Sequence, residues 1–278
     1  MEFLTLKEYL DMDIPDIEFY ETGSYCFDNI VGGILKSGIT VVAGGTGQGK
    51  SMVGLHLASL LSKENKVLYL SIENAIQIDI KRFRKTLEIY NVNEENITYI
   101  NAILYDESYS EILKTCLEKV KTGEYDIFVI DGADLMFKED GEGAKMYQEG
   151  QNFMKSLHKT LSDTSSSCIL TWQLNRGGIT KEIDEIDTSD IATSMGIVKF
   201  ASQVYVVKRY IKNEDKKETK KNKDNWKLRL IKTRTEANWE HSTIDILDNK
   251  NNINLTFYDD SCAFVDDLKN YIENKEED

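Results

Sequence analysis

A glycine-rich segment near the amino terminus carries the residue types that hold a phosphate chain. Gly44–Ser51 reads Gly-Gly-Thr-Gly-Gln-Gly-Lys-Ser and fills each required position of the pattern G-x-x-x-x-G-K-[ST]. Glycines let backbone N–H groups turn toward an anion, while a lysine can reach the terminal phosphates and a serine hydroxyl can bind Mg²⁺. The segment predicts a nucleotide site made by Gly44, Gly45, Thr46, Gly47, Gln48, Gly49, Lys50 and Ser51, with Ser51 also a metal ligand.

The sequence on either side of this segment has the pattern that such a site requires. Residues 38–43 form a short apolar, β-branched run that predicts a buried strand. Residues 51–61 are rich in Leu, Val and Ala and are long enough for a helix. Strand, glycine loop and helix place a helix amino terminus, with its partial positive charge, beside the phosphates. A glycine-rich turn that binds nothing is the less favoured interpretation.

Three further polar residues lie at the ends of predicted strands. Asp131 ends the apolar run 127–130, Glu73 ends 67–72, and Gln173 follows 168–172. Ligands of parallel sheets bind at the carboxyl ends of strands, so these side chains should face the phosphates. Asp131 would bind Mg²⁺ with Ser51, with Asp134 a weaker alternative. Glu73 would orient and deprotonate water, and Gln173 would detect the γ-phosphate.

Lys232 and Arg234 come directly after a predicted strand at 226–231. Alternate residues of an extended segment point the same way, so the two side chains could form a two-pronged cation. Within the sequence alone, no other feature distinguishes them.

The remaining elements alternate between strands and helices. We expect helices at 1–10, 76–90, 109–121 and 151–161, and further strands at 97–100 and 203–207. Residues 23–38 predict a turn-rich approach, while 136–150 and 176–190 predict loops, and 212–224 is typical of a solvated hairpin tip. Segments 241–247 and 253–258 predict a closing hairpin. The fold class is therefore α/β, with a doubly wound, mostly parallel sheet and a carboxyl-terminal antiparallel hairpin.

Composition limits the classes of protein that fit. The net charge is −14, which disfavours a protein that coats nucleic acid through a basic surface, although a local basic channel remains compatible with it. No run approaches the ~18 apolar residues of a membrane span, and the four cysteines are scattered without a C-x-x-C pair. We expect a reduced, cytoplasmic setting, in a bacterial cell or a phage-infected host, with no membrane partner.

Together these segments resemble the RecA-like P-loop ATPase core of DnaB-type hexameric replicative helicases, from about Gly23 to Tyr258. The glycine segment, the Leu-Ser-Ile-Glu that ends at Glu73, and the Val-Ile-Asp around Asp131 match family segments. Gln-Leu-Asn-Arg at 173–176 is the most discriminating match, and Lys-Thr-Arg at 232–234 resembles the family's K-x-R.

The resemblance implies an ATP-dependent DNA helicase that works in replication. It implies a homo-oligomeric, hexameric ring with ATP and Mg²⁺ at subunit interfaces and single-stranded DNA in the channel. Glu73 would then be the catalytic base, with Lys50 and Gln173 in the same site, and Lys232 and Arg234 would act on a neighbour's γ-phosphate. The loops near 138–151 and 176–190 would contact DNA, with Lys145, Arg176 and Lys181 as the cationic candidates.

The sequence departs from the family pattern in places. Residues 190–194 read Asp-Ile-Ala-Thr-Ser where the family has Asp-Leu-Arg-Glu-Ser, and Trp172 replaces a small residue. We expect an amino-terminal helix or arm over 1–22, an ATPase domain over 23–260, and a helix and acidic tail over 261–278. This is a minimal or phage-type arrangement in which primase, a loader or a separate amino-terminal-domain chain would be a partner.

Two other functions share most of these motifs. A RecA- or RadA-like recombination or repair ATPase would use the same glycine segment, Glu73 and Asp131. An ATP-gated assembly protein of the KaiC-like or loader kind would bind a protein partner, which the acidic composition favours slightly. Gln-Leu-Asn-Arg followed by K-x-R favours the helicase.

Overall fold

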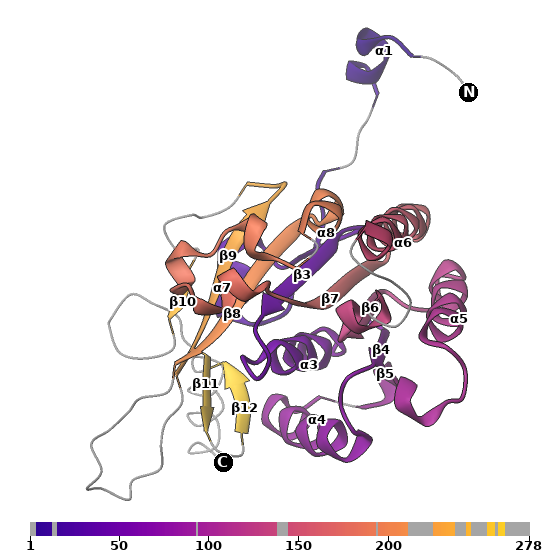
Figure 1. Cartoon of the computed structure of the whole chain (residues 1–278). Helices are drawn as coiled ribbons and strands as arrows, with labels where there is room; N and C mark the ends of the chain where they lie inside the picture. Colours follow the sequence, from indigo (N-terminus) through magenta and orange to yellow (C-terminus); the bar gives the residue numbers. More distant parts are fainter. Residues whose placement is uncertain are drawn as a thin grey trace, which may run out of the picture.

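The structure, a computed structural model, describes residues 4–12, 16–92, 94–137, 144–192, 194–210, 225–236, 243–245, 255–258 and 261–264. Its main element is a ten-stranded sheet in the order β12-β11-β9-β8-β3-β7-β6-β4-β5, with β10 also paired to β9 (Figure 1). The expected α/β class with a mostly parallel sheet is confirmed. In the described part of the chain, no helix is long and apolar enough to cross a membrane.

The parallel part of the sheet holds the strands that carry the predicted site. Its neighbours pair in parallel from β8 through β3, β7, β6 and β4 to β5. These strands are β3 (Ile39–Gly44), β4 (Val67–Ser71), β5 (Ile97–Asn101), β6 (Ile127–Asp131), β7 (Ser167–Gln173) and β8 (Gln203–Tyr210). Their carboxyl ends therefore meet at one edge of the sheet, as the sequence predicts.

The remaining strands pair antiparallel. β9 (Asn225–Thr233) runs beside β8, and both β10 (Thr243–Asp245) and β11 (Leu255–Tyr258) pair with β9. β11 also forms a hairpin with β12 (Ser261–Phe264). The expected hairpin between 241–247 and 253–258 is therefore wrong, because the long strand β9 offers pairing positions to both segments. The strand at 261–264 also occupies the start of the segment where a helix was expected.

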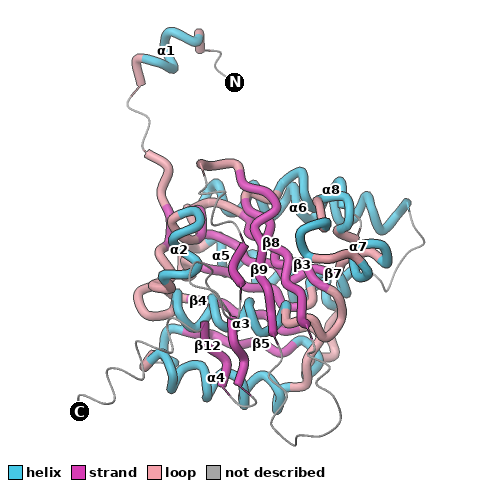
Figure 2. The backbone as a smooth tube through the Cα atoms, turned by 90° about the vertical axis from the view of Figure 1, so that its left-hand side faces the viewer, coloured by secondary structure: helices cyan, strands magenta, loops and turns pink. Residues whose placement is uncertain are grey.

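Alternating side chains of the strands form two cores, one on each face of the sheet. α2 (Tyr25–Val31), α3 (Lys50–Leu61) and α4 (Ile76–Tyr90) pack on the face that buries Val42, Tyr69 and Val129. α5 (Tyr109–Lys121), α6 (Ala144–Thr164) and α8 (Ser194–Phe200) pack on the opposite face with Val41, Leu70 and Ile130. This period-2 division explains why the central strands are apolar along their whole length, and the two helical layers are visible in Figure 2.

Several helix boundaries follow from local signals that the sequence shows. α4 covers the predicted range 76–90. α5 begins after a capping box, in which the Ser108 hydroxyl accepts from the Glu111 N–H and the Glu111 carboxylate accepts from Ser108. Such a box satisfies two backbone donors that the first helical turn leaves unpaired.

Three segments that were expected to be irregular contain helix. α6 begins at Ala144 rather than near residue 151, because a buried stripe at Phe153, Leu157 and Leu161 supports a long amphipathic helix that tolerates Gly150. In the approach 23–38, α2 ends at Gly32, whose φ of 84° closes the helix in the left-handed region, and β2 (Ile34–Leu35) pairs with β1 (Phe19–Tyr20). The third such segment, 176–190, begins with α7 (Arg176–Thr180).

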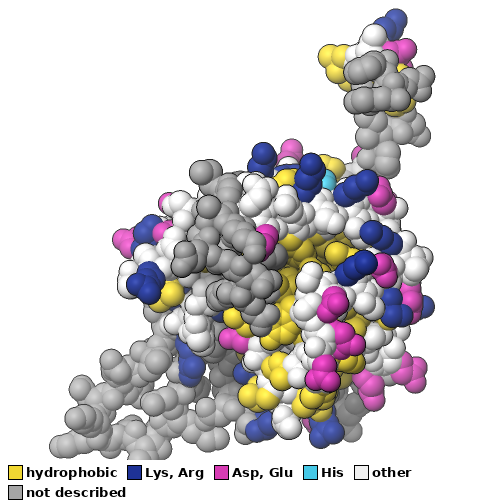
Figure 3. Space-filling view, turned by 45° about the vertical axis from the view of Figure 1, so that its right-hand side comes forward, with side chains coloured by type: hydrophobic (Ala, Val, Ile, Leu, Met, Phe, Trp, Pro, Cys, Tyr) yellow, Lys and Arg dark blue, Asp and Glu magenta, His cyan; other side chains and the backbone are white. Residues whose placement is uncertain are grey.

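The first helix, α1 (Leu6–Leu10), stands apart from the α/β body in all three whole-chain views (Figure 3). Leu6 and Leu10 are each 74% exposed, and Met12 and Ile17 are also exposed. The expected amphipathic helix is therefore present near residues 1–10. Its apolar side chains are not covered by the body of the same subunit.

Candidate functional site

The glycine loop between β3 and α3 has the backbone conformation of a phosphate cradle. Gly49 precedes the first helical residue with a φ of 99°, a conformation that other L-residues rarely adopt. At Gly44 a Cβ atom would lie 2.8 Å from the Val207 carbonyl oxygen, so a side chain there would displace β8. The two glycines are required by the path of the loop, which leads the chain directly into the amino terminus of α3.

Polar contacts hold the loop to its surroundings. Lys50 is 5% exposed, and its ammonium donates to the Gly45 carbonyl at 3.1 Å. The Gln48 side-chain oxygen accepts from the backbone N–H of Arg209, which ties the loop to β8 at 2.5 Å. A buried ammonium beside the loop backbone supplies a positive charge at the place where phosphate oxygens would lie.

Asp131 is the most strongly perturbed acid beside this loop. It is fully buried at the end of β6, and its two carboxylate oxygens accept from the Thr171 hydroxyl at 2.7 Å and the Asn74 amide at 3.0 Å. The Ser51 hydroxyl also bonds to it, so the two predicted metal ligands are in contact. Burial raises the pKa of Asp131 to about 6, and the hydrogen bonds from Thr171 and Ser51 oppose that rise.

Glu73 lies next to this acid. It comes two residues after the end of β4, is exposed, and its Cβ would be 3.2 Å from a Cβ placed on Gly132. The negative charge of Glu73 adds to the rise in the pKa of Asp131. Asp134, the weaker metal candidate, is buried in the 3-10 turn η3 (Ala133–Phe137). Ser51 therefore meets Asp131, and Glu73 stays accessible to a water molecule.

Gln173 contacts the glycine loop directly. At the end of β7, its side-chain amide donates to the Thr46 hydroxyl at 3.0 Å. The Gln173 carbonyl also accepts from the Ala192 N–H at 2.9 Å, so this residue joins the loop to the segment 174–192 that follows. A change at the phosphate cradle could therefore reach that segment through one side chain.

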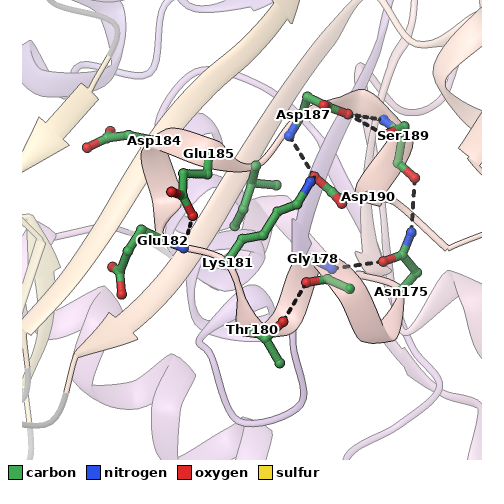
Figure 4. A network of polar contacts seen from close by, with 12 residues as sticks. Asn175, Gly178, Thr180, Lys181, Glu182, Asp184, Glu185, Asp187, Ser189 and Asp190 are labelled. Carbon is green, nitrogen blue, oxygen red and sulfur yellow. Dashed lines mark hydrogen bonds and ion pairs between the residues drawn. The ribbon is translucent and has the colours of Figure 1, made fainter.

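Segment 174–192 is compact and internally bonded (Figure 4). Asn175 caps α7 by accepting from the Gly178 N–H at 2.8 Å, and its amide donates to the Ser189 carbonyl at 3.0 Å. From β9, the Arg229 guanidinium donates to the carbonyls of Ile183 and Asp184. The segment closes where Leu174 pairs with Ile191. These contacts hold the segment against β8 and β9.

The three cationic candidates for DNA contact differ in their surroundings. Arg176 is exposed at the start of α7. Lys181 forms an ion pair at 2.7 Å with Asp190, which is only 5% exposed, and that bond raises the pKa of Lys181. The backbone of Lys145 lies in the first turn of α6, while its side chain and residues 138–143 lie outside the described part of the chain. Residues 211–224, the expected hairpin tip, also lie outside it.

Lys232 and Arg234 lie at the other edge of the sheet. Thr233 pairs with Gln203, which pairs with Thr40 near the start of β3, whereas the glycine loop follows the end of that strand. The Lys232 ammonium donates to the carbonyls of Val198 and Ala201, and the Arg234 guanidinium donates to that of Lys199. Burial and the nearby Arg234 lower the pKa of Lys232 to about 8. These two cations therefore do not join the cradle of their own subunit.

The sequence analysis did not identify Thr171 and Asn74, which both bond to Asp131. Thr171 also accepts from the Gly132 N–H at 2.7 Å, so it fixes both the acid and the turn after it. A polar residue inside the apolar run 168–172 was the available signal. Asn74 had no comparable signal, because its contact depends on how the turn after β4 folds.

The donors present fit a magnesium nucleotide. Ser51 and Asp131 offer a hydroxyl and a carboxylate oxygen in mutual contact, which are hard oxygen ligands of the kind that Mg²⁺ prefers. A metal there usually keeps several waters and binds through few protein groups plus the substrate phosphates. The buried Lys50 and the backbone N–H groups of the loop suit the phosphate chain itself.

Comparisons with known proteins identify related chains. The sequence model of the family described as "DnaB-like helicase C terminal domain" matches residues 20–244. The DNA repair protein RadA of Helicobacter pylori is 39% identical over 98 residues, which are 34% of this chain and 22% of that protein. RadA of Aquifex aeolicus is 30% identical over 131 residues, or 46% and 27%. The chain thus matches about a quarter of the length of these curated relatives.

Among solved structures, the ATPase domain of a helicase has a similar fold. The TM-score is 0.61 at 17% sequence identity, and the match covers 86% of this chain and 91% of that one. At that identity the likeness concerns the fold.

Proposed function

This chain belongs to the family of the DnaB-like helicase C-terminal domain, and we propose that it is the ATPase motor of a DNA helicase that works in replication. It hydrolyses ATP at interfaces between identical subunits and uses the energy to translocate on single-stranded DNA. The assembly that suits this activity is a hexameric ring, with ATP and Mg²⁺ bound between neighbouring subunits.

One observation carries the proposal. Lys50, the Ser51–Asp131 pair, Glu73 and Gln173 come from separate segments and gather at the carboxyl edge of one parallel sheet. Such a set supplies phosphate binding, metal binding, a base and a γ-phosphate contact, which are the components of nucleotide hydrolysis. A turn that binds nothing would have no need of a buried acid bonded to a serine at the first turn of α3.

The residues have distinct roles in the proposed reaction. Gly44–Gly49 and Lys50 bind the phosphates, and Ser51 with Asp131 would hold Mg²⁺, which neutralises charge on the β- and γ-oxygens when bound. Glu73 accepts a proton from the water whose oxygen attacks the γ-phosphorus, as the bond to the β-phosphate oxygen breaks and ADP leaves. The Gln173 amide, now on Thr46, contacts the γ-phosphate and passes its presence to segment 174–192.

The cation for the transition state comes from a neighbouring subunit. Lys232 and Arg234 lie at the amino edge of their own sheet, which supports action on a second copy rather than on the same chain. A cation supplied in this way is worth about 10³–10⁵ in rate. We expect an isolated subunit to be a poor ATPase.

The DNA-binding surface is segment 174–192 together with the region near 138–151. Arg176 is the cation that this segment exposes for phosphate contact, and Lys181 contributes only when it leaves Asp190. α1, with its exposed Leu6 and Leu10, packs on a neighbouring subunit or on a partner. Primase, a loader or a separate amino-terminal-domain chain are the proposed protein partners.

The first experiment is to measure ATP turnover by the purified chain over a range of protein concentrations, with and without single-stranded DNA. Turnover per subunit that rises with concentration, and again with DNA, supports a motor with shared sites. Lys50→Ala is the control, because it removes the phosphate-binding charge and should abolish hydrolysis. Unchanged turnover in that variant would eliminate the proposed site.

The same measurement tests the alternatives. A repair ATPase related to RadA is suggested by the partial matches to that protein, but these cover under half of the chain, whereas the helicase family covers residues 20–244. DNA-stimulated turnover without strand separation would favour the RadA-like function. Turnover that depends on assembly but ignores DNA would favour an assembly ATPase with a protein partner.

A further inference from the structure

A row of buried polar residues crosses the carboxyl edge of the sheet beside the proposed site. Ser71 at the end of β4 is the register partner of Asn101 on β5 and of Asp131 on β6. Asn101 is 3% exposed, and the other two are fully buried. A buried side-chain amide is costly unless it is hydrogen-bonded, so its partners indicate what it supports.

The side chain of Asn101 is bonded through both its oxygen and its nitrogen. Its oxygen accepts from the Ile103 N–H at 3.1 Å and thereby caps the 3-10 turn η2 (Ala102–Leu104). Its amide nitrogen donates to the Asn74 carbonyl at 2.8 Å and to the Tyr99 hydroxyl at 2.9 Å. The bond to Asn74 is made to the backbone directly after Glu73.

The turn between β4 and α4 is fixed at its ends by other groups. Ile72 donates its backbone N–H to the Asp131 carbonyl at 2.9 Å, which anchors the end nearer β4. At the other end, Asp79 in α4 is 1% exposed and accepts from the Ser71 hydroxyl at 2.6 Å and the Tyr99 hydroxyl at 3.0 Å. Between these anchors, the exposed Glu73 is placed by the bond that Asn101 makes to the next residue.

Asn74 uses its own side chain in the opposite direction. Its amide donates to the Asp131 carboxylate at 3.0 Å. One residue thus receives a hydrogen bond from β5 through its carbonyl and gives one to the metal-side acid on β6. The position of Glu73 relative to Asp131 is therefore set through Asn74, and the position of Asn74 is set by Asn101.

We propose that Asn101 is a positioning residue for Glu73, which rests on the proposed role of Glu73 as the base. A general base must lie within about 2.6–3.2 Å of the atom whose proton it takes, and a displacement of 1 Å can cost about 10²-fold in rate. Among the described residues, the side-chain hydrogen bonds of Asn101 reach neither the phosphate loop nor a predicted metal ligand. Its effect should appear in the chemical step and not in nucleotide binding.

The test compares Asn101→Ala with Ser108→Ala. Each variant loses a side-chain oxygen that caps a helical turn, but only the first loses the donor to the Asn74 carbonyl. Asn101→Asp keeps the capping oxygen and removes the amide donor. We expect both Asn101 variants to lower kcat for ATP at least tenfold, with the Kd for a non-hydrolysable ATP analogue within twofold of the wild type. Ser108→Ala should keep kcat within twofold.

A double variant separates positioning from general loosening of the fold. If Asn101 acts through Glu73, adding Asn101→Ala to Glu73→Gln should slow single-turnover hydrolysis by less than twofold beyond Glu73→Gln alone, because coupled residues are not additive. A further tenfold loss, or an Asn101→Ala kcat within twofold of the wild type, overturns the inference. Absence of turnover in the wild type would instead overturn the proposed function, and this inference with it.

Discussion

At the scale of single residues, the proposed site places a carboxylate where its charge is unfavourable. Asp131 is fully buried, and burial raises its pKa from 3.8 to about 6 despite three hydrogen-bond donors. Because the native state holds the proton more tightly than the unfolded chain, the stability of the metal-free protein should fall as the pH rises from about 4 through 6. Binding sites are often less stable than the rest of the fold would allow.

Asp131→Asn should separate this cost from the function. A pKa that moves from 3.8 to about 6 corresponds to about 3 kcal/mol, so the variant should be more stable than the wild type by up to that amount at pH 8. The difference should shrink toward pH 4, where Asp131 is protonated. Urea unfolding at both pH values, without nucleotide or Mg²⁺, measures it.

The same variant should lose Mg²⁺-dependent ATP turnover. A variant that is less stable than the wild type at pH 8 would contradict the assigned cost of the buried charge. Other acids with raised pKa values, such as Asp79, are present in both proteins and cancel in the comparison.

Sequence reasoning found the residues whose position follows from a strand end. Asp131 and Gln173 end apolar runs, Glu73 follows one closely, and the parallel sheet brings all three to the same edge as the glycine loop. Thr171 and Asn101 occupy strand positions too, but their side-chain partners depend on register between strands far apart in sequence. That register is a tertiary property, which explains why the supporting contacts were missed.

At the scale of elements, segment 174–192 was expected to be a loop and contains three short helical turns. These are α7, η4 (Ile183–Glu185) and η5 (Thr188–Asp190), each opened by a residue with a capping role. Capping residues are also common in loops, so the sequence alone could not distinguish the two. Long elements with a clear period, such as α4 and the central strands, were predicted within a residue or two.

The contacts of this segment predict unequal roles for its two cations. Arg176→Ala should weaken binding to single-stranded DNA several-fold and reduce the salt slope of the affinity by about 1, because an exposed guanidinium can neutralise a phosphate. Lys181→Ala should change the affinity by less than twofold, since the lysine is already paired with Asp190. Fluorescence anisotropy with a labelled oligonucleotide at several salt concentrations measures both.

Equal losses in these two variants would show that Lys181 leaves its carboxylate partner when DNA binds. Loss in neither would remove α7 from the DNA surface.

At the scale of the whole molecule, the two halves of the proposed catalytic set lie at opposite edges of one sheet. Arg234→Ala should abolish hydrolysis while leaving nucleotide binding within a few-fold of the wild type. Mixing Arg234→Ala subunits with Glu73→Gln subunits should restore part of the activity, because some interfaces then join an intact base to an intact cation. ATP turnover over a series of mixing ratios measures this rescue, and its absence at every ratio would contradict action between subunits.

The exposed helix α1 gives a second test of assembly. Leu6→Asp combined with Leu10→Asp should shift the chain toward smaller species in sedimentation velocity, because each leucine is 74% exposed on its own subunit. Lys7→Asp, on the same helix, changes charge without removing apolar surface and is the matched control. An unchanged distribution in the double variant would mean that α1 packs within its own subunit in solution.

The opposite placement of the phosphate loop and the Lys232–Arg234 pair has a consequence for counting. A head-to-tail row of such subunits completes one site at each junction, so a closed ring has as many complete sites as subunits and an open row has one fewer. The subunit at the open end keeps a phosphate loop that binds ATP without the cation that speeds its hydrolysis. Nucleotide should therefore persist longest at a gap, and a break in the ring would be marked by the ATP that it fails to consume.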